Sequence, residues 1–138
     1  MTDLKSIKKI FPKNTDCIKF LEEILWQNEP VCPYCPQSSP KAYVISPLGD
    51  RYHCNSCNTS FSVTAKTIFA RTRCDLRKWF LAIYLLYSPR SRITVRELAD
   101  AIKTTKDTAW LIQSKIDKAK IESPYLLETI VGKIDSIK

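Results

Sequence analysis

Four cysteines have the residue type and the spacing of a metal site. They form two C-x2-C pairs, Cys32 with Cys35 and Cys54 with Cys57, separated by eighteen residues, which is the spacing of a structural zinc site. Four thiolates satisfy the tetrahedral preference of Zn2+ and leave no position for water. We therefore predict one structural Zn2+ that builds the fold and does not catalyse a reaction. Because four thiolates and one Zn2+ sum to −2, the formal charge of +8 becomes about +6 when the site is filled.

Other uses of these cysteines require features that the sequence does not favour. Two disulfides are typical of secreted proteins, but the first residues, MTDLKSIKKIF, contain no apolar signal segment. A thioredoxin-like C-x-x-C motif opens a helix, whereas residues 36–39 are typical of a loop. A [4Fe–4S] cluster uses the same four thiolates and is the alternative metal group. Cys17 and Cys74 are expected to be reduced thiols that pack as small hydrophobic side chains.

Length and composition limit the class of protein. A chain of 138 residues with 44% hydrophobic residues and two glycines is expected to form one ordinary domain or two small ones. No apolar run reaches the roughly eighteen residues that a transmembrane helix requires. We expect a cytoplasmic, nucleoid-associated protein that contacts no membrane.

The positive charge is concentrated in one short segment. Residues 71–93 contain six basic residues and one acidic residue, so this segment supplies +5 of the total of +8. Guanidinium groups suit DNA because they make planar, bidentate contacts with phosphate. A solvated charged face without a ligand is the alternative. The residues of this segment predicted to contact DNA are Arg71, Arg73, Arg77, Lys78, Arg90 and Arg92.

The elements around the cysteines are expected to form a zinc ribbon preceded by one helix. Apolar side chains recur at helical spacing over residues 15–26, with Asn14 or Thr15 as the N-cap. Short strands are predicted at residues 41–46, 51–53 and 61–63. A sheet this small has few apolar side chains, so we expect metal binding and folding to be coupled. We assign residues 11–70 to this first domain.

Residues 71–122 are expected to form a helical domain. Asp75 is a suitable N-cap for a helix that ends at Tyr87 and is apolar nearly all the way round. A helix of this kind is typical of the centre of a core. The predicted fold class is therefore α+β, in which the zinc ribbon and its preceding helix are followed by helices.

The segment after this helix has the spacing of a helix-turn-helix unit. Two helices are predicted, over residues 94–102 and from Thr105 to about residue 120. Lys103 occupies the turn position, where glycine is common because it favours a positive φ, and another residue costs about 1 kcal/mol there. Counted from the small residue Ala99, the apolar positions of such a unit are filled by Leu98, Ile102, Ala109 and Ile112.

The second helix of a helix-turn-helix unit enters the major groove of DNA. Hydroxyl and ammonium groups suit phosphates, and an ammonium or a carboxylate suits a guanine or a cytosine edge. Trp110 and Leu111 are expected to pack against another helix or a partner, because large apolar side chains are rarely left in water. A helical hairpin with no role in DNA binding is the alternative. The outward residues predicted to contact DNA are Thr105, Lys106, Asp107 and Ser114.

The order of these motifs resembles a known family. A helix ending in tryptophan (FLEEILW) is followed by CPYC, RYHCNSC, FSVTAKTIF, LRKWFLAIYLLYS and a helix-turn-helix with TAW in its second helix. Over residues 11–121 the chain resembles the N-terminal region of bacterial insertion-sequence transposases of the ISXO type. The resemblance implies a zinc ribbon and a helix-turn-helix that recognise double-stranded DNA at the terminal inverted repeats. In the family, a DDE-like nuclease domain with a Mg2+-dependent acidic triad follows them.

Two positions depart from the family pattern. Relatives have a segment resembling G-x-V-E-x-D-E, whereas this chain has GKIDSIK at residues 132–138, and Ile137 stands where the first catalytic aspartate is expected. Pro36 follows the first C-x2-C pair in place of a common glycine, and it has no N–H to donate to a metal-bound sulfur. We therefore interpret residues 123–138 as a truncated tail where a nuclease domain would begin, in a module that does not cleave DNA alone.

No catalytic constellation is predicted in the chain. Its single histidine, His53, adjoins Cys54 in the metal unit, so no nucleophile–base pair is formed. We expect no enzymatic activity. The alternative function is a zinc-ribbon protein-interaction module or regulator that docks a nuclease subunit supplied in trans, and a second copy of this chain is a further candidate partner.

Overall fold

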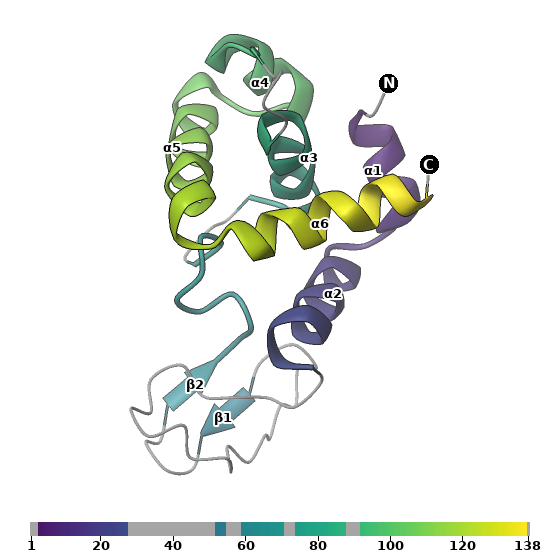
Figure 1. The fold of residues 1–138 in the computed structure, drawn as a ribbon, viewed down its shortest axis with the longest axis vertical. Helices are drawn as coiled ribbons and strands as arrows, with labels where there is room; N and C mark the ends of the chain where they lie inside the picture. Colours follow the sequence, from purple (N-terminus) through teal and green to yellow (C-terminus); the bar gives the residue numbers. More distant parts are fainter. Residues whose placement is uncertain (1–2, 28–51, 55–58, 71–73, 88–91, 138) are drawn as a thin grey trace. The chain divides into compact units, whose positions relative to one another are not determined.

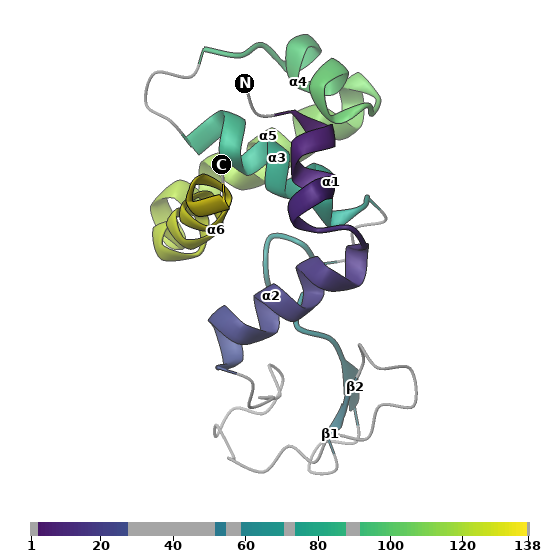
Figure 2. The ribbon, with the colours of Figure 1, turned by 90° about the vertical axis from the view of Figure 1, so that its right-hand side faces the viewer.

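The computed structural model shows an α+β fold that divides into two compact units, as drawn in Figure 1 and Figure 2. It describes residues 3–27, 52–54, 59–70, 74–87 and 92–137. The first unit, here called the helical unit, contains residues 1–14 and 73–138, and the second, the ribbon unit, contains residues 15–72. Among the described residues, no helix combines the length and the apolar character needed to cross a membrane.

Helix α3 (Leu76–Tyr87) is the centre of the helical unit. It contacts all four other helices of the unit: α1 (Leu4–Ile10), α4 (Val95–Ile102), α5 (Lys106–Glu122) and α6 (Pro124–Ile137). Figure 1 shows α3 between α5 on one side and α1 on the other. The buried side chains of α3 are Leu76, Trp79, Phe80, Leu81, Ala82, Ile83 and Leu86. The prediction of a nearly all-apolar core helix is confirmed.

The first turn of α3 is fixed by hydrogen bonds. The Asp75 carboxylate accepts the backbone N–H of Arg77 (2.8 Å), which confirms the predicted N-cap. The same carboxylate forms an ion pair with the Arg77 guanidinium (2.8 Å), which also donates to the backbone carbonyl of Pro12 (2.7 Å). The side chain of Asn14 accepts the backbone N–H of Leu76 (2.8 Å). These bonds thus join Pro12 and Asn14 to the first turn of α3.

The Asp75–Arg77 pair predicts a dependence of stability on pH. The hydrogen bond from the Arg77 side chain holds the pKa of the Asp75 carboxyl below its ordinary value. The unfolded chain therefore binds this proton more readily, so the stabilisation is present at neutral pH and is lost as the pH falls below about 4. We expect Asp75→Asn, which keeps the cap but removes the charge, to lower the free energy of unfolding by about 1 kcal/mol at pH 7.

Urea unfolding of both proteins across a pH series checks this expectation. The difference between them should shrink toward zero below about pH 4, where the wild-type carboxyl becomes protonated. Asp117→Asn is the matched control, because the Asp117–Lys120 pair is long (3.6 Å) and exposed and should contribute little. If Asp75→Asn and Asp117→Asn changed the free energy of unfolding equally at every pH, the Asp75–Arg77 pair would not be the cause of the pH dependence.

Two helices of this unit, α1 and α6, are absent from the sequence predictions. Helix α6 lies in the segment that we interpret from sequence as a tail, yet it contacts α3. The hydroxyls of Tyr84 and Tyr87 donate to Asp135 (2.9 Å) and Glu128 (2.8 Å) of α6. The buried side chains of α6 are Leu126, Leu127, Ile130 and Ile134. This segment is therefore part of the core of the helical unit.

Helix α1 adds a second element to that core. Asp3 caps it by accepting the N–H of Ser6 (2.9 Å), and Leu4 and Ile7 are buried. The ring of Phe11, at the C-cap of α1, packs edge-to-face on Phe80 of α3, with the ring centroids 5.1 Å apart. A helix of seven residues is too short to be stable alone, so its packing on α3 supplies its stability.

The ribbon unit contains α2 (Asn14–Trp26) and two short strands, β1 (Tyr52–Cys54) and β2 (Thr59–Phe61). The helix and the first of these strands are confirmed close to their predicted positions. Because α2 begins at Asn14, neither Asn14 nor Thr15 is its N-cap, and that prediction is wrong. The predicted strand at residues 41–46 lies outside the described residues.

The strand predicted at residues 61–63 is displaced toward the N-terminus. Strand β2 ends at Phe61, and successive turns follow it, in which Ser62, Thr64 and Thr67 carbonyls accept backbone N–H groups three residues on. The hydroxyls of Ser62 and Thr64 also bond to each other (2.9 Å). Serine and threonine hydroxyls compete with the strand ladder for such contacts, which explains the early end of β2.

Candidate metal centre and nucleic-acid interface

Cys54 lies at the end of a short hairpin. Strands β1 and β2 pair antiparallel, with Tyr52 opposite Phe61 and Cys54 opposite Thr59. Cys54 is the last residue of β1, and Cys57, the other cysteine of the second C-x2-C pair, lies outside the described residues. The side chain of Cys54 is buried. A buried cysteine of a C-x2-C pair is a suitable zinc ligand.

The other three predicted ligands, Cys32, Cys35 and Cys57, lie outside the described residues. Accordingly, within the part of the chain that the structure describes, no group of three or more His, Cys, Asp or Glu side chains is placed to hold a metal ion. The placement of Cys54 fits the predicted thiolate set, and the complete set of four remains a prediction.

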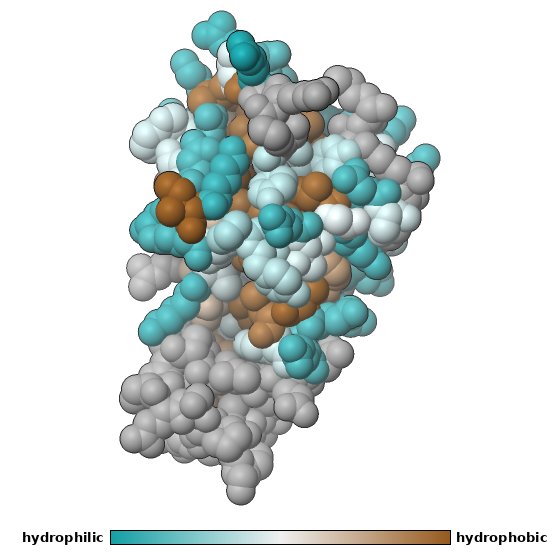
Figure 3. All heavy atoms as spheres, viewed as in Figure 1, coloured by the Kyte–Doolittle hydropathy of each residue, from teal (hydrophilic) through white to brown (hydrophobic). Residues whose placement is uncertain are grey.

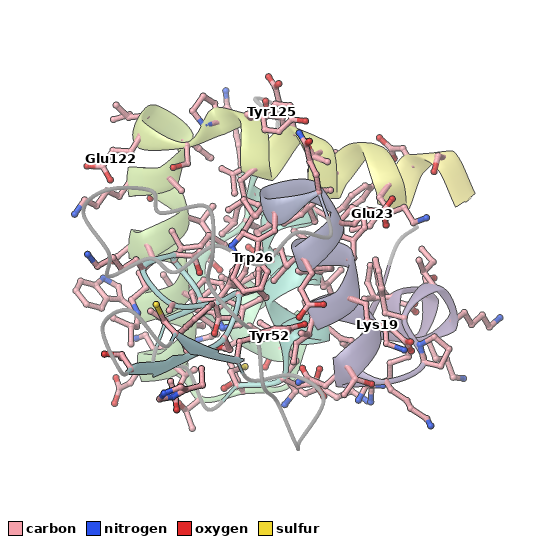
Figure 4. All side chains as sticks on the ribbon, turned by 90° about the horizontal axis from the view of Figure 1, so that it is seen from below. Lys19, Glu23, Trp26, Tyr52, Glu122 and Tyr125 are labelled. Atoms are coloured by element: carbon pink, nitrogen blue, oxygen red, sulfur yellow. The ribbon has the colours of Figure 1, made fainter. Side chains whose placement is uncertain are left out.

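An aromatic cluster holds the hairpin against α2. The ring of Trp26, at the end of α2, packs edge-to-face on Tyr52 (5.4 Å between centroids) and on Phe61 (5.7 Å), and Figure 4 shows Trp26 next to Tyr52. The Tyr52 hydroxyl donates to the carboxylate of Glu22 on α2 (2.7 Å). Each edge-to-face pair contributes about 0.5–1.5 kcal/mol beyond burial of its area. These contacts position the strand that carries Cys54.

Helices α4 and α5 are joined by a short turn, as predicted. Thr94 and Glu97 form a capping box at the start of α4, in which each side chain accepts the other residue's backbone N–H (3.1 Å). Accepting the backbone N–H of Thr94 lowers the pKa of the Glu97 carboxyl. Thr105 caps α5 by accepting the N–H of Thr108 (3.2 Å). Both caps fix where the turn begins and ends.

The turn itself contains the expected left-handed residue. Lys103 has φ 56° and ψ 56°, and its N–H bonds to the carbonyls of Ala99 and Asp100. The N–H of Thr104 also bonds to the carbonyl of Ala99 (2.9 Å). Helices α4 and α5 contact each other, and both contact α3. All of the apolar positions singled out in the sequence are buried: Leu98, Ala99, Ile102, Ala109 and Ile112.

Four of the predicted DNA contacts are engaged within the protein. Arg77 is held by Asp75, and the Lys78 ammonium donates to the carbonyl of Lys103 (3.0 Å). The Thr105 hydroxyl serves the cap and also donates to the hydroxyl of Thr108 (2.9 Å). The hydroxyl of Ser114 donates to the carbonyl of Trp110 (2.9 Å). In the structure, these four side chains therefore stabilise the fold of the protein.

The remaining predicted contacts differ in placement. Arg92, Lys106 and Asp107 are exposed and make no hydrogen bond or ion pair with any residue that the structure describes. Lys106 and Asp107 stand together in the first turn of α5, and Arg96 and Lys103 are exposed nearby on α4 and in the turn. The net charge of their sequence segment does not point to Arg96 and Lys103, because acidic residues in the same segment nearly cancel the positive charge. Arg71, Arg73 and Arg90 lie outside the described residues.

The outer face of α5 also carries large apolar side chains. Trp110 is 61% exposed and Leu111 is 49% exposed, so the expectation that another helix of this chain covers them is wrong. Ile121 and Tyr125, at the junction of α5 and α6, are exposed as well. Figure 3 shows an apolar side chain standing out among hydrophilic ones over α5. Packing of Trp110 and Leu111 against a partner stays a prediction.

Comparison with known proteins shows what the chain is similar to. Residues 12–60 match the transposase zinc-ribbon domain of the IS1595 type. A protein of the transposable element ISH50 from Halobacterium salinarum (strain NRC-1) is 30% identical over 102 residues, which are 74% of this chain and 34% of that protein. The match thus spans about a third of the relative's length. No solved structure shows significant similarity to the chain. These matches confirm the predicted resemblance to insertion-sequence transposases, and residues 12–60 are similar to their zinc-ribbon domain.

Proposed function

We propose that the chain is a zinc-dependent DNA-binding module of an insertion-sequence transposase and recognises the terminal inverted repeats of the element. The observation that carries this proposal is the first turn of α5, where Lys106 and Asp107 are exposed and make no hydrogen bond or ion pair with the described residues. In a helix-turn-helix unit the N-terminal residues of the second helix read base edges. The packing of α4 and α5 on α3 supports that assignment.

The charges around α5 support DNA as the ligand. Lys106 reaches a guanine edge or a phosphate, and Asp107 accepts from the amino group of a cytosine. Lys103, in the turn, and Arg96, on α4, are exposed cations beside this helix and suit the flanking phosphates. Arg92, just before α4, extends the set. Positive charge near the reading helix supplies the sequence-independent part of the affinity.

Zinc has a structural role in this proposal. One Zn2+ held by Cys32, Cys35, Cys54 and Cys57 supplies a closed tetrahedral cross-link and no open position for chemistry. The residues of the ribbon unit position the hairpin through the Trp26 cluster. In this proposal the ribbon unit is a separate module, and side chains of the helical unit bind the DNA.

The test measures binding of the zinc-loaded chain to DNA that flanks its gene and to scrambled DNA, across a salt series. We expect tight, sequence-selective binding to the flanking DNA. Lys106→Gln is expected to weaken binding and to reduce the log–log salt slope by about 0.9 if it contacts a phosphate. Asp107→Asn is expected to change the preference at one base pair by about 1–3 kcal/mol.

Lys9→Gln provides the matched control. Lys9 is an exposed lysine on α1, and Figure 1 shows α1 across α3 from α5. Lys9→Gln removes the same charge from the same unit as Lys106→Gln. Because α1 lies across α3 from α5, the affinity for DNA should change little. If Lys106→Gln and Lys9→Gln behave alike, then α5 is not the DNA-binding helix. Weak binding that is equal on both DNAs would contradict recognition of transposon ends.

The exposure of Trp110 and Leu111 favours a second candidate function, protein docking. Exposed pairs of large apolar side chains often mark protein contacts, and a nuclease subunit supplied in trans would be the partner. The same experiment separates the two functions. Trp110→Ala lowers selective DNA affinity when this face reads DNA, and leaves it unchanged when the face serves only a protein partner.

A further inference from the structure

We propose that Lys78 is a positioning residue that holds the turn between α4 and α5 and thereby sets the direction of the DNA-reading helix. The position of Lys78 in the most basic segment of the chain, residues 71–93, predicts a phosphate contact for it. In the structure its ammonium donates to the backbone carbonyl of Lys103 (3.0 Å). The inference rests on the proposed function of α5, and it concerns how α5 is held.

The turn requires support because of its conformation. Lys103 adopts the left-handed region with φ 56° and ψ 56°, which a residue with a Cβ occupies at a cost and glycine does not. The N–H groups of Lys103 and Thr104 satisfy carbonyls of the last turn of α4. The carbonyl of Lys103 itself accepts from Lys78, a contact that is strengthened by the positive charge. A cation at the C-terminal end of α4 is also favoured by the helix dipole.

Lys78 is well placed to act as a fixed support. It lies in the first turn of α3, where Asp75 caps the helix and the neighbouring Arg77 is clamped by an ion pair. Helix α3 contacts both α4 and α5. The single bond from Lys78 to Lys103 therefore links the centre of the core to the residue where the chain changes direction. Loss of this bond reduces the fraction of molecules in which α5 has its binding-competent orientation.

The first experiment measures hydrogen exchange of the turn amides and needs no DNA. Lys78→Met keeps the aliphatic stem but removes the charge and the donor. We expect exchange at Lys103 and Thr104 to accelerate by about threefold to tenfold. Lys78→Arg should restore protection, and Lys118→Met is the matched control, because Lys118 is an exposed lysine of α5. Unchanged exchange at the turn in Lys78→Met would overturn the proposal.

The second experiment uses the flanking DNA in a salt series. Lys78→Met should weaken binding by about threefold to tenfold with an unchanged salt slope, because Lys78 contacts a carbonyl and not a phosphate. In a Lys103→Gly background, the same substitution should have less than about a twofold effect, since glycine adopts this conformation without strain. If Lys78→Met reduced the salt slope and weakened binding as much in the Lys103→Gly chain as in the wild-type chain, Lys78 would contact a phosphate. That result would overturn the proposal.

The two experiments distinguish the inference from the proposed function. Faster exchange in Lys78→Met with no DNA binding by the wild-type chain would contradict the proposed function but support the role of Lys78 in the turn. Where Lys78→Met does not fold, Lys78→Gln, which keeps a shorter donor, replaces it and should show smaller changes in the same directions. Equal protection of the turn in Lys78→Gln and Lys78→Arg would then count against the proposal.

Discussion

Removal of zinc is expected to unfold the hairpin of the ribbon unit and to leave the helical unit folded. Within the described residues the sheet has two strands of three residues each, and a pair of strands of this size is marginal in water. Binding of structural zinc supplies about 10–16 kcal/mol in comparable small domains, so it outweighs the contribution of the aromatic cluster. Hydrogen exchange with and without a zinc chelator should show loss of protection in β1 and β2, while α3 to α6 keep theirs.

Two cysteine variants test the assignment of the ligands. Cys54→Ser is expected to reproduce the effect of chelation and to reduce the bound zinc measured by elemental analysis. Cys74→Ser is the matched control, because Cys74 lies just before α3 and is not a predicted ligand. Its zinc content should stay at about one ion per chain. A Cys54→Ser protein that retains zinc and the protection of β1 would show that Cys54 does not bind the metal.

Replacement of Leu127 by alanine is expected to lower the free energy of unfolding of the helical unit by about 3 kcal/mol. Leu127 is fully buried on α6, which packs on α3. The substitution removes apolar contacts and leaves a cavity that the surrounding helices fill only in part. Urea unfolding, followed by the far-ultraviolet signal of the helices, measures the change.

Tyr125→Ala is the control for this prediction. Tyr125 lies in the same helix and loses a larger side chain, but it is 67% exposed, so the expected change is within about 0.5 kcal/mol. An equally small change for Leu127→Ala would contradict the packing of α6 and would agree with the interpretation of residues 123–138 as a tail. A large change for both would contradict the exposure of Tyr125.

Local signals in the sequence were sufficient where a structural feature depends on residues close together in the chain. The cap at Asp75, which was predicted from residue type, bonds to an N–H group only two residues on. The left-handed turn at Lys103 follows from the spacing of the two helices around it. Likewise, the C-x2-C pairs predict the zinc ribbon that the family comparison identifies.

The role of each basic side chain could not be predicted from charge. A high density of arginine and lysine indicates a phosphate-binding surface, yet Arg77 bonds to Pro12, 65 positions away in sequence, and Lys78 bonds to Lys103, 25 positions away. Only the folded chain brings these groups together. The same reason explains Asn14, whose side chain bonds to Leu76 and not to its own helix.

The sequence alone was enough to predict the apolar helix α3, the turn between α4 and α5 and the resemblance to a transposase zinc ribbon, because each depends on residue types at short, regular intervals. Only the folded structure shows that α6 belongs to the core, that Trp110 is exposed and that Lys78 bonds to the carbonyl of Lys103. Those properties depend on which surfaces meet, and the free energy of such contacts comes from residues distant in sequence that become neighbours only when α3 packs against the other helices.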